Sequence, residues 1–366
     1  MTKQVTEILE KRLSGQKLTE REAVTLIRAS DISPFDEKII SAASQLERPR
    51  KNEVFVLPPL YISSSCVNAC TYCNFHGKGK SLSLNEFEDE FRWLVDSGHR
   101  SIELVFGQDP KMFVPETNFD GKDQRYDVTK VAEYFQKAKQ ILDQNGGGML
   151  TVNAPAVDEL SYNKLKNAGL DVMLLWQETF NPMRYKKLHP GNTPKSFQDY
   201  RLNVYDRARN AGMEHIAGTF LKGLYDWRVE EQMLCHLDRD LYERQGRGFS
   251  MIGTPRIKNF EKYHVSDEDY ILNIALDLLI YSGPLWLQTR ESWELNSKIY
   301  DQFGGGFIQT IDTSTAPGGY AKLGKGKAQF PVHPYQRNVI EKSLMQKGIN
   351  TVYSWNVQDL SSIQRV

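Results

Sequence analysis

Apolar side chains recur at two different spacings in this sequence, and the spacing changes near residue 50. Up to that point they repeat every three or four positions, which is the period of amphipathic helices and predicts two or three short ones. The clearest is LTEREAVTLIRAS (residues 18–30), where Thr19 is placed to cap the start of the helix. We therefore expect an N-terminal helical extension over residues 1–50.

Beyond residue 50, short apolar runs of strand length alternate with longer amphipathic stretches. We expect eight strands, at residues 54–63, 101–107, 149–154, 172–178, 215–220, 249–255, 285–291 and 307–313. Helical patterns lie between them, at residues 83–97, 127–144, 157–168, 195–211, 227–244 and 267–281. Strictly alternating strands and helices favour right-handed crossovers and a parallel sheet.

This order predicts an α/β fold, a (β/α)8 TIM-type barrel over residues 51–330, with a C-terminal helix and tail over residues 331–366. The alternative is an open doubly wound sheet, but no G-x-G-x-x-G follows the first strand, so its dinucleotide-binding form lacks its fingerprint. In a barrel the chemistry lies on the loops that leave the carboxyl ends of the strands.

Charge and hydropathy favour a small-molecule substrate. The 46 basic and 46 acidic side chains cancel, so no overall field attracts nucleic acid or an anionic membrane. The start of the chain lacks the apolar core of a secretory signal, which predicts a cytoplasmic protein. The most apolar stretch, residues 270–287, is interrupted by Asn273, Asp277 and a Gly-Pro pair, so no membrane span is expected.

Three of the four cysteines lie in the loop that follows the first strand. Cys66, Cys70 and Cys73 have the spacing C-x3-C-x2-C, which lets one loop bring three thiolates around one inorganic centre. In a reducing cytosol such clusters are metal ligands or redox groups rather than disulfides. Three protein ligands leave one position open for a substrate or cofactor. Cys235, inside a helical pattern, is expected to be a buried structural thiol.

A structural zinc site is the alternative interpretation of this loop. His76 extends the spacing to C-x3-C-x2-C-x2-H, which is sterically suitable for one tetrahedral ion. A domain of this length needs no zinc to fold, and the mouth of a barrel is where a reactive centre belongs.

The same spacing, with Tyr72 just before the last cysteine, resembles the signature of the radical S-adenosylmethionine (SAM) superfamily. The resemblance implies that Cys66, Cys70 and Cys73 hold a [4Fe–4S] cluster whose fourth iron chelates the amino and carboxylate groups of S-adenosylmethionine. It further implies a 5′-deoxyadenosyl radical that abstracts a hydrogen from the substrate, and it places Tyr72 near the adenine.

Further stretches are similar to the aromatic amino-acid lyase branch of that superfamily, which includes the tyrosine lyase of thiamine biosynthesis, a hydrogenase maturase and a tryptophan lyase. The resemblance runs from about residue 55 to the end. It is carried in the order of that branch by PLYISSSCVNACTYC (59–73), WQETFNPMRYKKLHP (176–190), GTPRIK (253–258), LQTRES (287–292) and TAPGGYAK (315–322).

This resemblance assigns roles to side chains at strand ends. Arg290 matches the arginine that holds the substrate carboxylate, and Thr310 stands where a serine usually grips the amino acid. Its added methyl narrows the pocket. An ion pair between Arg290 and Glu291 is the alternative. A guanidinium is well suited to a carboxylate because it presents paired donors and keeps its charge.

Cofactor contacts are assigned in the same way. Gln177 and Glu178 resemble a Gln-Glu pair near cofactor and substrate, and Asn153 is placed to bond the ribose. Gly107 and Gln108 stand where the branch has Gly-Glu beside the methionine amino group. Within GTPRIK, Arg256 completes the predicted set. Glu178 has the alternative of pairing only with Arg256 or Lys258, and Asn153 that of a strand-end turn.

The sequence also departs from the branch. Gln108 brings no negative charge, and the segment DPKMFVPETNFDGKDQRYD (109–127) is longer than expected for the tyrosine lyase. No cysteine follows Cys235, so the second cluster of the hydrogenase maturase is not expected. GKGKS (77–81) ends like a phosphate loop, but that pattern needs glycine at position 74, where the chain has Asn74. We interpret it as a mobile basic loop beside the cofactor, and PGGY (317–320) as a turn.

The resemblance predicts a radical lyase that cleaves the Cα–Cβ bond of free tyrosine to p-cresol and dehydroglycine (2-iminoacetate). Its expected partners are a flavodoxin- or ferredoxin-type electron donor and a thiazole synthase. A tryptophan lyase, a mutase or lyase of another amino acid, and a zinc-stabilised binding protein are the alternatives.

Overall fold

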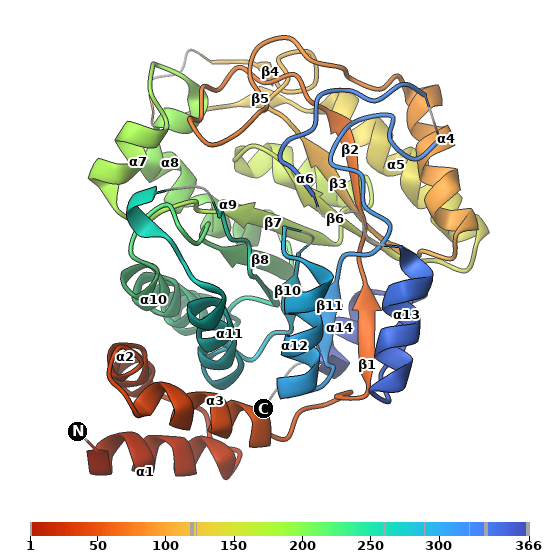
Figure 1. Ribbon diagram of the computed structural model, residues 1–366. Helices are drawn as coiled ribbons and strands as arrows, with labels where there is room; N and C mark the ends of the chain where they lie inside the picture. The colour runs from red at the N-terminus through yellow and green to blue at the C-terminus, as the bar shows by residue number, and fades with distance from the viewer. Residues whose placement is uncertain are drawn as a thin grey trace.

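A computed structural model describes residues 2–117, 121, 123–258, 261–288, 290–321, 323–332 and 336–363. Its main sheet has ten strands, all paired in parallel, curled into a barrel with helices outside (Figure 1). In sheet order they are β12 (Asn350–Val352), β1 (Glu53–Val56), β11 (Phe307–Gln309), β10 (Leu285–Leu287), β9 (Met251–Gly253), β8 (His215–Thr219), β7 (Val172–Trp176), β6 (Met149–Asn153), β3 (Ser101–Phe106) and β2 (Pro59–Ser63). The predicted TIM-type α/β fold is confirmed.

Helices alternate with these strands as the sequence predicts. The outer layer consists of α4 (Leu84–Asp96), α5 (Thr129–Gln144), α6 (Glu159–Asn167), α7 (Pro182–Leu188), α8 (Gln198–Leu202), α9 (Val204–Asn210), α10 (Trp227–Gln245), α11 (Asp267–Ile280), α12 (Trp293–Phe303) and α13 (Arg337–Gln346). The pattern over 195–211 is interrupted, because a 3-10 turn at Pro194–Ser196 and the short α8 and α9 replace one helix. Within the described part of the chain, every helix falls short of the length and apolar character that a membrane span requires.

The N-terminal helices α1 (Thr2–Leu13), α2 (Glu20–Ala29) and α3 (Phe35–Gln45) lie beneath the barrel, outside α10 and α11 (Figure 1). Thr19 caps α2 as predicted: its side chain accepts from the Glu22 N–H, and Glu22 accepts from the Thr19 N–H. Reciprocal bonds of this kind satisfy donors that a helix start leaves unpaired.

The first predicted strand, 54–63, is divided in two. β1 pairs with β11, whereas β2 pairs with β3, so the chain changes partner between Val56 and Pro59. Pro58 and Pro59 stand at this point, and proline has no N–H to give to a ladder. The division lets the upper half of the strand lean away and carry the cysteine loop to the mouth of the barrel.

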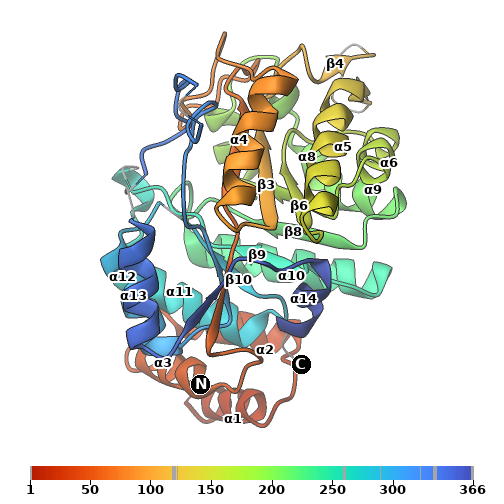
Figure 2. The same ribbon diagram turned by 90° about the vertical axis from the view of Figure 1, so that its right-hand side faces the viewer.

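The C-terminal segment forms a strand that the sequence analysis did not predict. β12 pairs with β1, and the chain then passes below β3, where the Ser101 hydroxyl donates to the Trp355 carbonyl (2.7 Å). α14 (Val357–Ile363) follows at the lower end of the barrel (Figure 2).

Inward side chains at the lower ends of the strands form an apolar core that we call the floor. The floor consists of Phe55, Leu57, Met149, Val172, Leu174, Ala217, Met251, Trp286, Ile308, Trp355, Leu360 and Ile363. Its last three members come from the C-terminal segment, which therefore closes the barrel from below. The opposite, carboxyl end of the strands is left for the loops.

Candidate active site

A cavity of about 1130 Å³, part of it open to solvent, lies at the carboxyl ends of the barrel strands. Ten of the twelve side chains and glycines that the sequence analysis assigned to the site line it: Cys66, Cys70, Tyr72, Cys73, Gly107, Gln108, Asn153, Glu178, Arg290 and Thr310. They come from segments that follow six different strands or end them. Barrel topology brings these segments together because all parallel strands end at the same rim.

The cysteine loop is held tightly against the rim. Cys66 pairs through its backbone with Gly77, and the Thr71 N–H donates to the Leu188 carbonyl (3.0 Å). At Gly107 a Cβ atom would lie 2.4 Å from the Ser65 carbonyl oxygen, so only glycine lets β3 approach the loop this closely. The predicted importance of Gly107 therefore has a steric reason.

Backbone and side-chain N–H groups point at the cysteine sulfurs. Asn68 Nδ2 lies 3.6 Å from Cys66 Sγ, and the Phe75 N–H lies 3.4 Å from Cys73 Sγ. Burial raises the pKa of Cys70 to about 11, with Lys195 opposing the shift. Since a thiol ligand must lose its proton, these buried thiols suit a cationic inorganic centre that displaces it. N–H donors to sulfur are among the groups that tune iron–sulfur clusters.

The zinc alternative finds no support in the position of His76. Its ring is exposed, and Nε2 lies 3.5 Å from the Lys327 ammonium. Among the described residues no three His, Cys, Asp or Glu side chains gather closely enough to hold one metal ion. A [4Fe–4S] cluster needs no such convergence, because each of its three thiolates binds a different iron.

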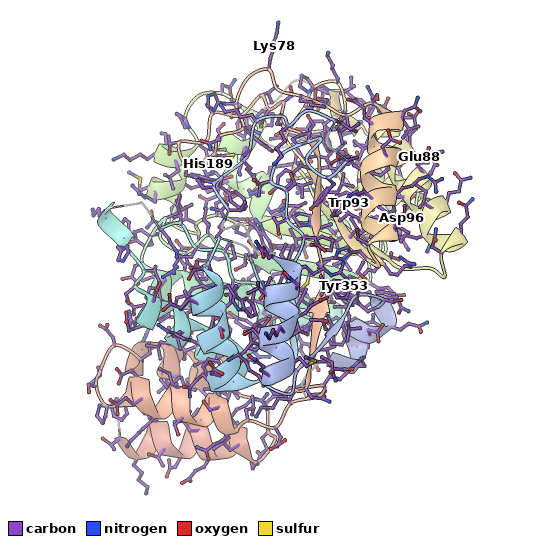
Figure 3. The ribbon with its side chains drawn as sticks, turned by 45° about the vertical axis from the view of Figure 1, so that its right-hand side comes forward. Lys78, Glu88, Trp93, Asp96, His189 and Tyr353 are labelled. Atoms are coloured by element: carbon purple, nitrogen blue, oxygen red, sulfur yellow. The ribbon has the colours of Figure 1, made fainter. Side chains whose placement is uncertain are left out.

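Tyr72 is oriented by His189 (labelled in Figure 3). The phenol O–H lies 2.8 Å from His189 Nε2, and His189 Nδ1 lies 2.9 Å from the Tyr185 carbonyl oxygen. Burial, reinforced by the charge of Lys195, lowers the pKa of His189 to about 3, so the imidazole is neutral. A neutral ring that donates from Nδ1 accepts at Nε2, which fixes the direction of the Tyr72 hydroxyl.

Glu178 is the ionised carboxylate of the cavity. Burial alone would raise its pKa, but Lys195 (2.7 Å) and Arg201 (3.3 Å) outweigh burial and lower it to about 2. The alternative partners Arg256 and Lys258 are wrong, because both pair with Glu291. Glu178 also has a left-handed backbone with φ 70°, a conformation that costs roughly 1–3 kcal/mol in a residue other than glycine.

Two predicted cofactor contacts do not line the cavity. Gln177 is fully buried and donates from Nε2 to the Arg201 carbonyl (3.2 Å). Arg256 is 2% exposed, and its guanidinium is occupied by Glu291, Asp267 and the Val265 carbonyl. The assignment of both to cofactor binding is corrected: strand alternation turns Gln177 away from the barrel axis, and a buried carboxylate claims Arg256.

Gln108 belongs to a directed chain of hydrogen bonds. Asn68 Nδ2 donates to Gln108 Oε1 (2.7 Å), and Gln108 Nε2 donates to the Tyr126 hydroxyl (2.8 Å). Tyr126 in turn donates to Gln124 Oε1 (2.9 Å). Tyr126 and Gln124 both belong to the long segment 109–127. The two departures from the branch, Gln108 and this segment, therefore contact each other. The segment contains a short hairpin, β4 (Val114–Pro115) and β5 (Tyr126–Asp127).

Arg290 faces the cavity, and no carboxylate in the described part of the chain pairs with it. Its guanidinium carbon lies 3.6 Å from the centre of the Phe330 ring, and its buried Nε has no hydrogen-bond partner among the described residues. The alternative pairing with Glu291 is wrong, because Glu291 pairs with Arg256. The Thr310 hydroxyl accepts the Trp286 indole N–H (2.9 Å), so its own hydrogen remains for a ligand.

Three charged side chains of the cavity were missed by the sequence analysis. Lys195 and Arg201 reach Glu178 from the segment between β7 and β8, and no local pattern marks either one. Glu103 lies inside β3 and accepts from Asn153 Nδ2 (3.0 Å), and burial raises its pKa to about 8. Of these three residues, only Glu103 had a sign in the sequence, because a glutamate inside an otherwise apolar strand is unusual.

Among the described residues that line the cavity, three are cations at neutral pH, Lys195, Arg201 and Arg290, and one is an ionised carboxylate, Glu178. This excess of positive charge suits ligands that carry carboxylates, together with thiolates bound to a cluster.

Comparison with known proteins agrees with this site. A family model, the radical SAM superfamily, matches residues 60–233. The 2-iminoacetate synthase of Escherichia coli is 26% identical over 360 residues, which cover 94% of this chain and 89% of the relative. A crystal structure of HydG, a maturase of the [FeFe]-hydrogenase, superposes with a TM-score of 0.84 at 27% identity, covering 99% of this chain and 78% of that one. Methylornithine synthase (PylB) shares the fold, with a TM-score of 0.66 at 17% identity.

The cysteine spacing, the barrel that carries it and these comparisons give one result. The cofactors of the protein are a [4Fe–4S] cluster and S-adenosylmethionine, and residues 60–233 of this enzyme match the radical SAM superfamily.

Proposed function

We propose that this enzyme cleaves the Cα–Cβ bond of free tyrosine, giving p-cresol and 2-iminoacetate. The proposal is carried by Arg290, whose guanidinium faces the cavity and pairs with no carboxylate among the described residues. An α-amino acid supplies the missing carboxylate, and a paired-donor contact fixes its orientation. The similarity to 2-iminoacetate synthase over 94% of the chain supports the same reaction.

The reaction needs a strong hydrogen-abstracting group, and the bound cluster with S-adenosylmethionine supplies it. The residues of the chain bind, orient and shield. Cys66, Cys70 and Cys73 are the proposed cluster ligands, and Glu178, held by Lys195 and Arg201, offers an ionised carboxylate to the ammonium group of a ligand. Gln108 offers a neutral acceptor, its carbonyl oxygen, next to the cysteine loop.

The substrate end of the cavity is proposed to lie between Arg290 and Thr310. Five of the aromatic rings that line the cavity are available for apolar and edge-on contacts with a phenol ring: Tyr61, Phe106, Trp176, Trp286 and Phe330. Enclosure matters because water and oxygen would quench a carbon radical. Asn153, whose Nδ2 donates to Glu103, remains a proposed contact of the cofactor ribose through its side-chain oxygen.

Anaerobic incubation with tyrosine, S-adenosylmethionine and dithionite tests the proposal. The expected products are p-cresol, glyoxylate from hydrolysis of 2-iminoacetate, and 5′-deoxyadenosine. The matched assay contains each of the other nineteen amino acids in turn. Deoxyadenosine formation above background with another amino acid, and no p-cresol with tyrosine, would replace the substrate while keeping the radical chemistry.

Two partners belong to the same proposal. A flavodoxin- or ferredoxin-type protein is proposed to supply the electron, since the reaction consumes one that the chain cannot generate. A thiazole synthase is proposed to receive 2-iminoacetate, because an imine of this kind hydrolyses in water. Faster trapping of the product when the synthase is present at equal total enzyme activity would support a direct transfer.

A further inference from the structure

The tetrapeptide GKGK occurs twice in this chain, at residues 77–80 and 324–327. Although 243 residues separate Lys80 from Leu323, the Lys80 ammonium donates to the carbonyl oxygens of Leu323 (3.0 Å) and Gly324 (2.9 Å). The first glycine of each copy has a left-handed backbone, with φ 67° at Gly77 and 80° at Gly324. The fold therefore places two similar basic turns side by side at the mouth of the barrel.

These turns produce a concentration of positive charge in a chain whose overall charge is zero. We call Lys78, Lys325, Lys327 and His76 the lysine face. All four are exposed, and Figure 3 shows Lys78 extending from the mouth of the barrel into solvent. Neither segment 74–80 nor segment 323–330 contains an Asp or Glu. In the described part of the chain, no carboxylate pairs with any of its three lysines. Lys80, by contrast, is already paired with Glu86 (3.3 Å).

The lysine face lies directly outside the cysteine loop. Cys73 is the most exposed of the three cysteines of that loop. The Asn74 N–H donates to the Gln329 carbonyl (3.2 Å), and Gln329 Nε2 lies 3.9 Å from Cys73 Sγ. Both basic turns thus border the sulfur that is nearest to solvent. An electron carrier docked here would lie beside the cysteine that is most exposed to solvent.

We propose that the lysine face is the docking site of an acidic, one-electron carrier protein of the flavodoxin type. The proposal rests on the proposed function, which consumes one electron from outside the chain for each cofactor cleaved. In the transfer the carrier is oxidised by one electron and the bound cofactor is reduced by the same electron. No atom passes between the two proteins.

The chemistry of the face favours a broad acidic surface over a small anion. Its ammonium groups are exposed on separate long side chains. Such dispersed charge steers a large charged partner and accelerates its encounter. The phosphate-loop pattern, which would cradle a small anion, is broken at Asn74.

The test compares two triple charge reversals. The face variant carries Lys78→Glu, Lys325→Glu and Lys327→Glu. The control variant carries Lys17→Glu, Lys38→Glu and Lys342→Glu, which change the net charge equally at exposed lysines. Lys17 and Lys38 belong to the N-terminal helical region beneath the barrel, and Lys342 lies on α13. Binding is measured on the reconstituted enzyme by the fluorescence anisotropy of oxidised flavodoxin. Turnover is measured once with reduced flavodoxin and once with dithionite.

The face variant should bind flavodoxin about tenfold more weakly or worse and lose flavodoxin-driven turnover by a similar factor. Its dithionite-driven turnover should equal that of the parent, because dithionite needs no docking surface. The control variant should match the parent in all three assays. Flavodoxin-driven turnover of the parent should also fall with rising salt, more steeply than that of the face variant.

Unchanged flavodoxin binding in the face variant would overturn the docking proposal, as would an equal loss in the control variant. A loss with dithionite as well would overturn it too, because the lysines would then serve the reaction itself. Failure of the proposed function looks different: the parent enzyme would form no p-cresol with dithionite, while the difference in flavodoxin binding between the variants would remain measurable.

Discussion

The floor and the cavity are built by the same strands and have opposite characters. On the floor, inward side chains are apolar, and the one indole N–H contributed by the C-terminal segment, that of Trp355, donates to the Val56 carbonyl (2.7 Å). In the cavity, several inward side chains are ionised. The Glu178 backbone is left-handed there, and Arg290 Nε has no hydrogen-bond partner among the described residues. The floor is therefore packed by the chain's own side chains, whereas the cavity has polar groups that a ligand would pair with.

The lower part of each strand therefore contributes mainly to stability, and its carboxyl end contributes mainly to function. Burial of the apolar floor side chains stabilises the folded state, and this offsets the free-energy cost of the strained and charged groups in the cavity. Trp286 marks the boundary, since its ring belongs to the floor while its N–H donates to Thr310 in the cavity. Changes on the floor should therefore affect unfolding, and changes in the cavity should affect turnover.

The largest effect is expected from the cysteine loop. Serine in place of Cys66, Cys70 or Cys73 should abolish cleavage of S-adenosylmethionine and lower the iron content after reconstitution, because a serine hydroxyl does not replace a thiolate ligand. Cys235→Ala, deep in α10, is the matched control and should keep both. Full iron loading and cleavage in all three serine variants would refute the cluster assignment.

A change on the floor should have the opposite effect: it should lower the stability of the protein and leave its turnover unchanged. Trp355→Ala removes a ring packed edge-on against Phe55 (5.4 Å) and should lower the free energy of unfolding by about 3–5 kcal/mol. Trp355→Phe loses chiefly the hydrogen bond to Val56 and should cost about 1 kcal/mol. Denaturant unfolding measures both, and turnover per bound cluster below the melting temperature should stay at the parent value. An unchanged midpoint for the alanine variant would show that the floor does not need this ring.

Replacing Arg290 should affect substrate binding, whereas replacing Arg256 should affect stability. Arg290→Gln should lower kcat/KM for tyrosine by about 10²-fold to 10³-fold without lowering the melting temperature, because no carboxylate among the described residues pairs with its guanidinium. Arg256→Gln leaves Glu291 buried with Lys258 as its remaining cationic partner and should cost about 3–5 kcal/mol of unfolding free energy. If both variants lose activity and stability alike, the distinction between the arginines is wrong.

The smallest expected effect is a pH dependence from the cavity carboxyl Glu103. Burial raises its pKa from 4.5 to about 8, so the folded chain keeps a proton that the unfolded chain releases. Stability should therefore fall as pH rises between about 4.5 and 8 and level off above. Glu230, whose pKa burial raises to about 7, acts in the same direction.

Glu103→Gln should remove the Glu103 part of this slope, about 1–3 kcal/mol between pH 5 and pH 8. Urea unfolding of the cluster-free protein at pH 5, 6.5 and 8 measures it for parent and variant. The slope due to Glu230 should remain in both proteins. Identical slopes would mean that Glu103 is ionised in the folded chain and that water reaches it.

Local sequence was sufficient for the features that neighbouring residues make together. The cysteine spacing, the Thr19 cap and the order of strands and helices all depend on contacts within one loop or one turn. The N-terminal helix pattern was read correctly for the same reason. The split of the first strand had a local sign, the two prolines, but its consequence depended on which strand lay beside each half.

Distant pairings were beyond the sequence. Arg256 and Arg290 both follow strand ends, and their different roles are decided by where Glu291 lies in space. Lys195 and Arg201 reach Glu178 from a separate segment, and the short β12 closes the floor only because β1 is beside it. The chain alone determined the spacing of the cysteines proposed as ligands and the alternation of elements, since periodicity and spacing are local. The tertiary structure decided which charges are paired, which remain open to a ligand, and which end of the barrel is sealed, because long-range packing sets all three.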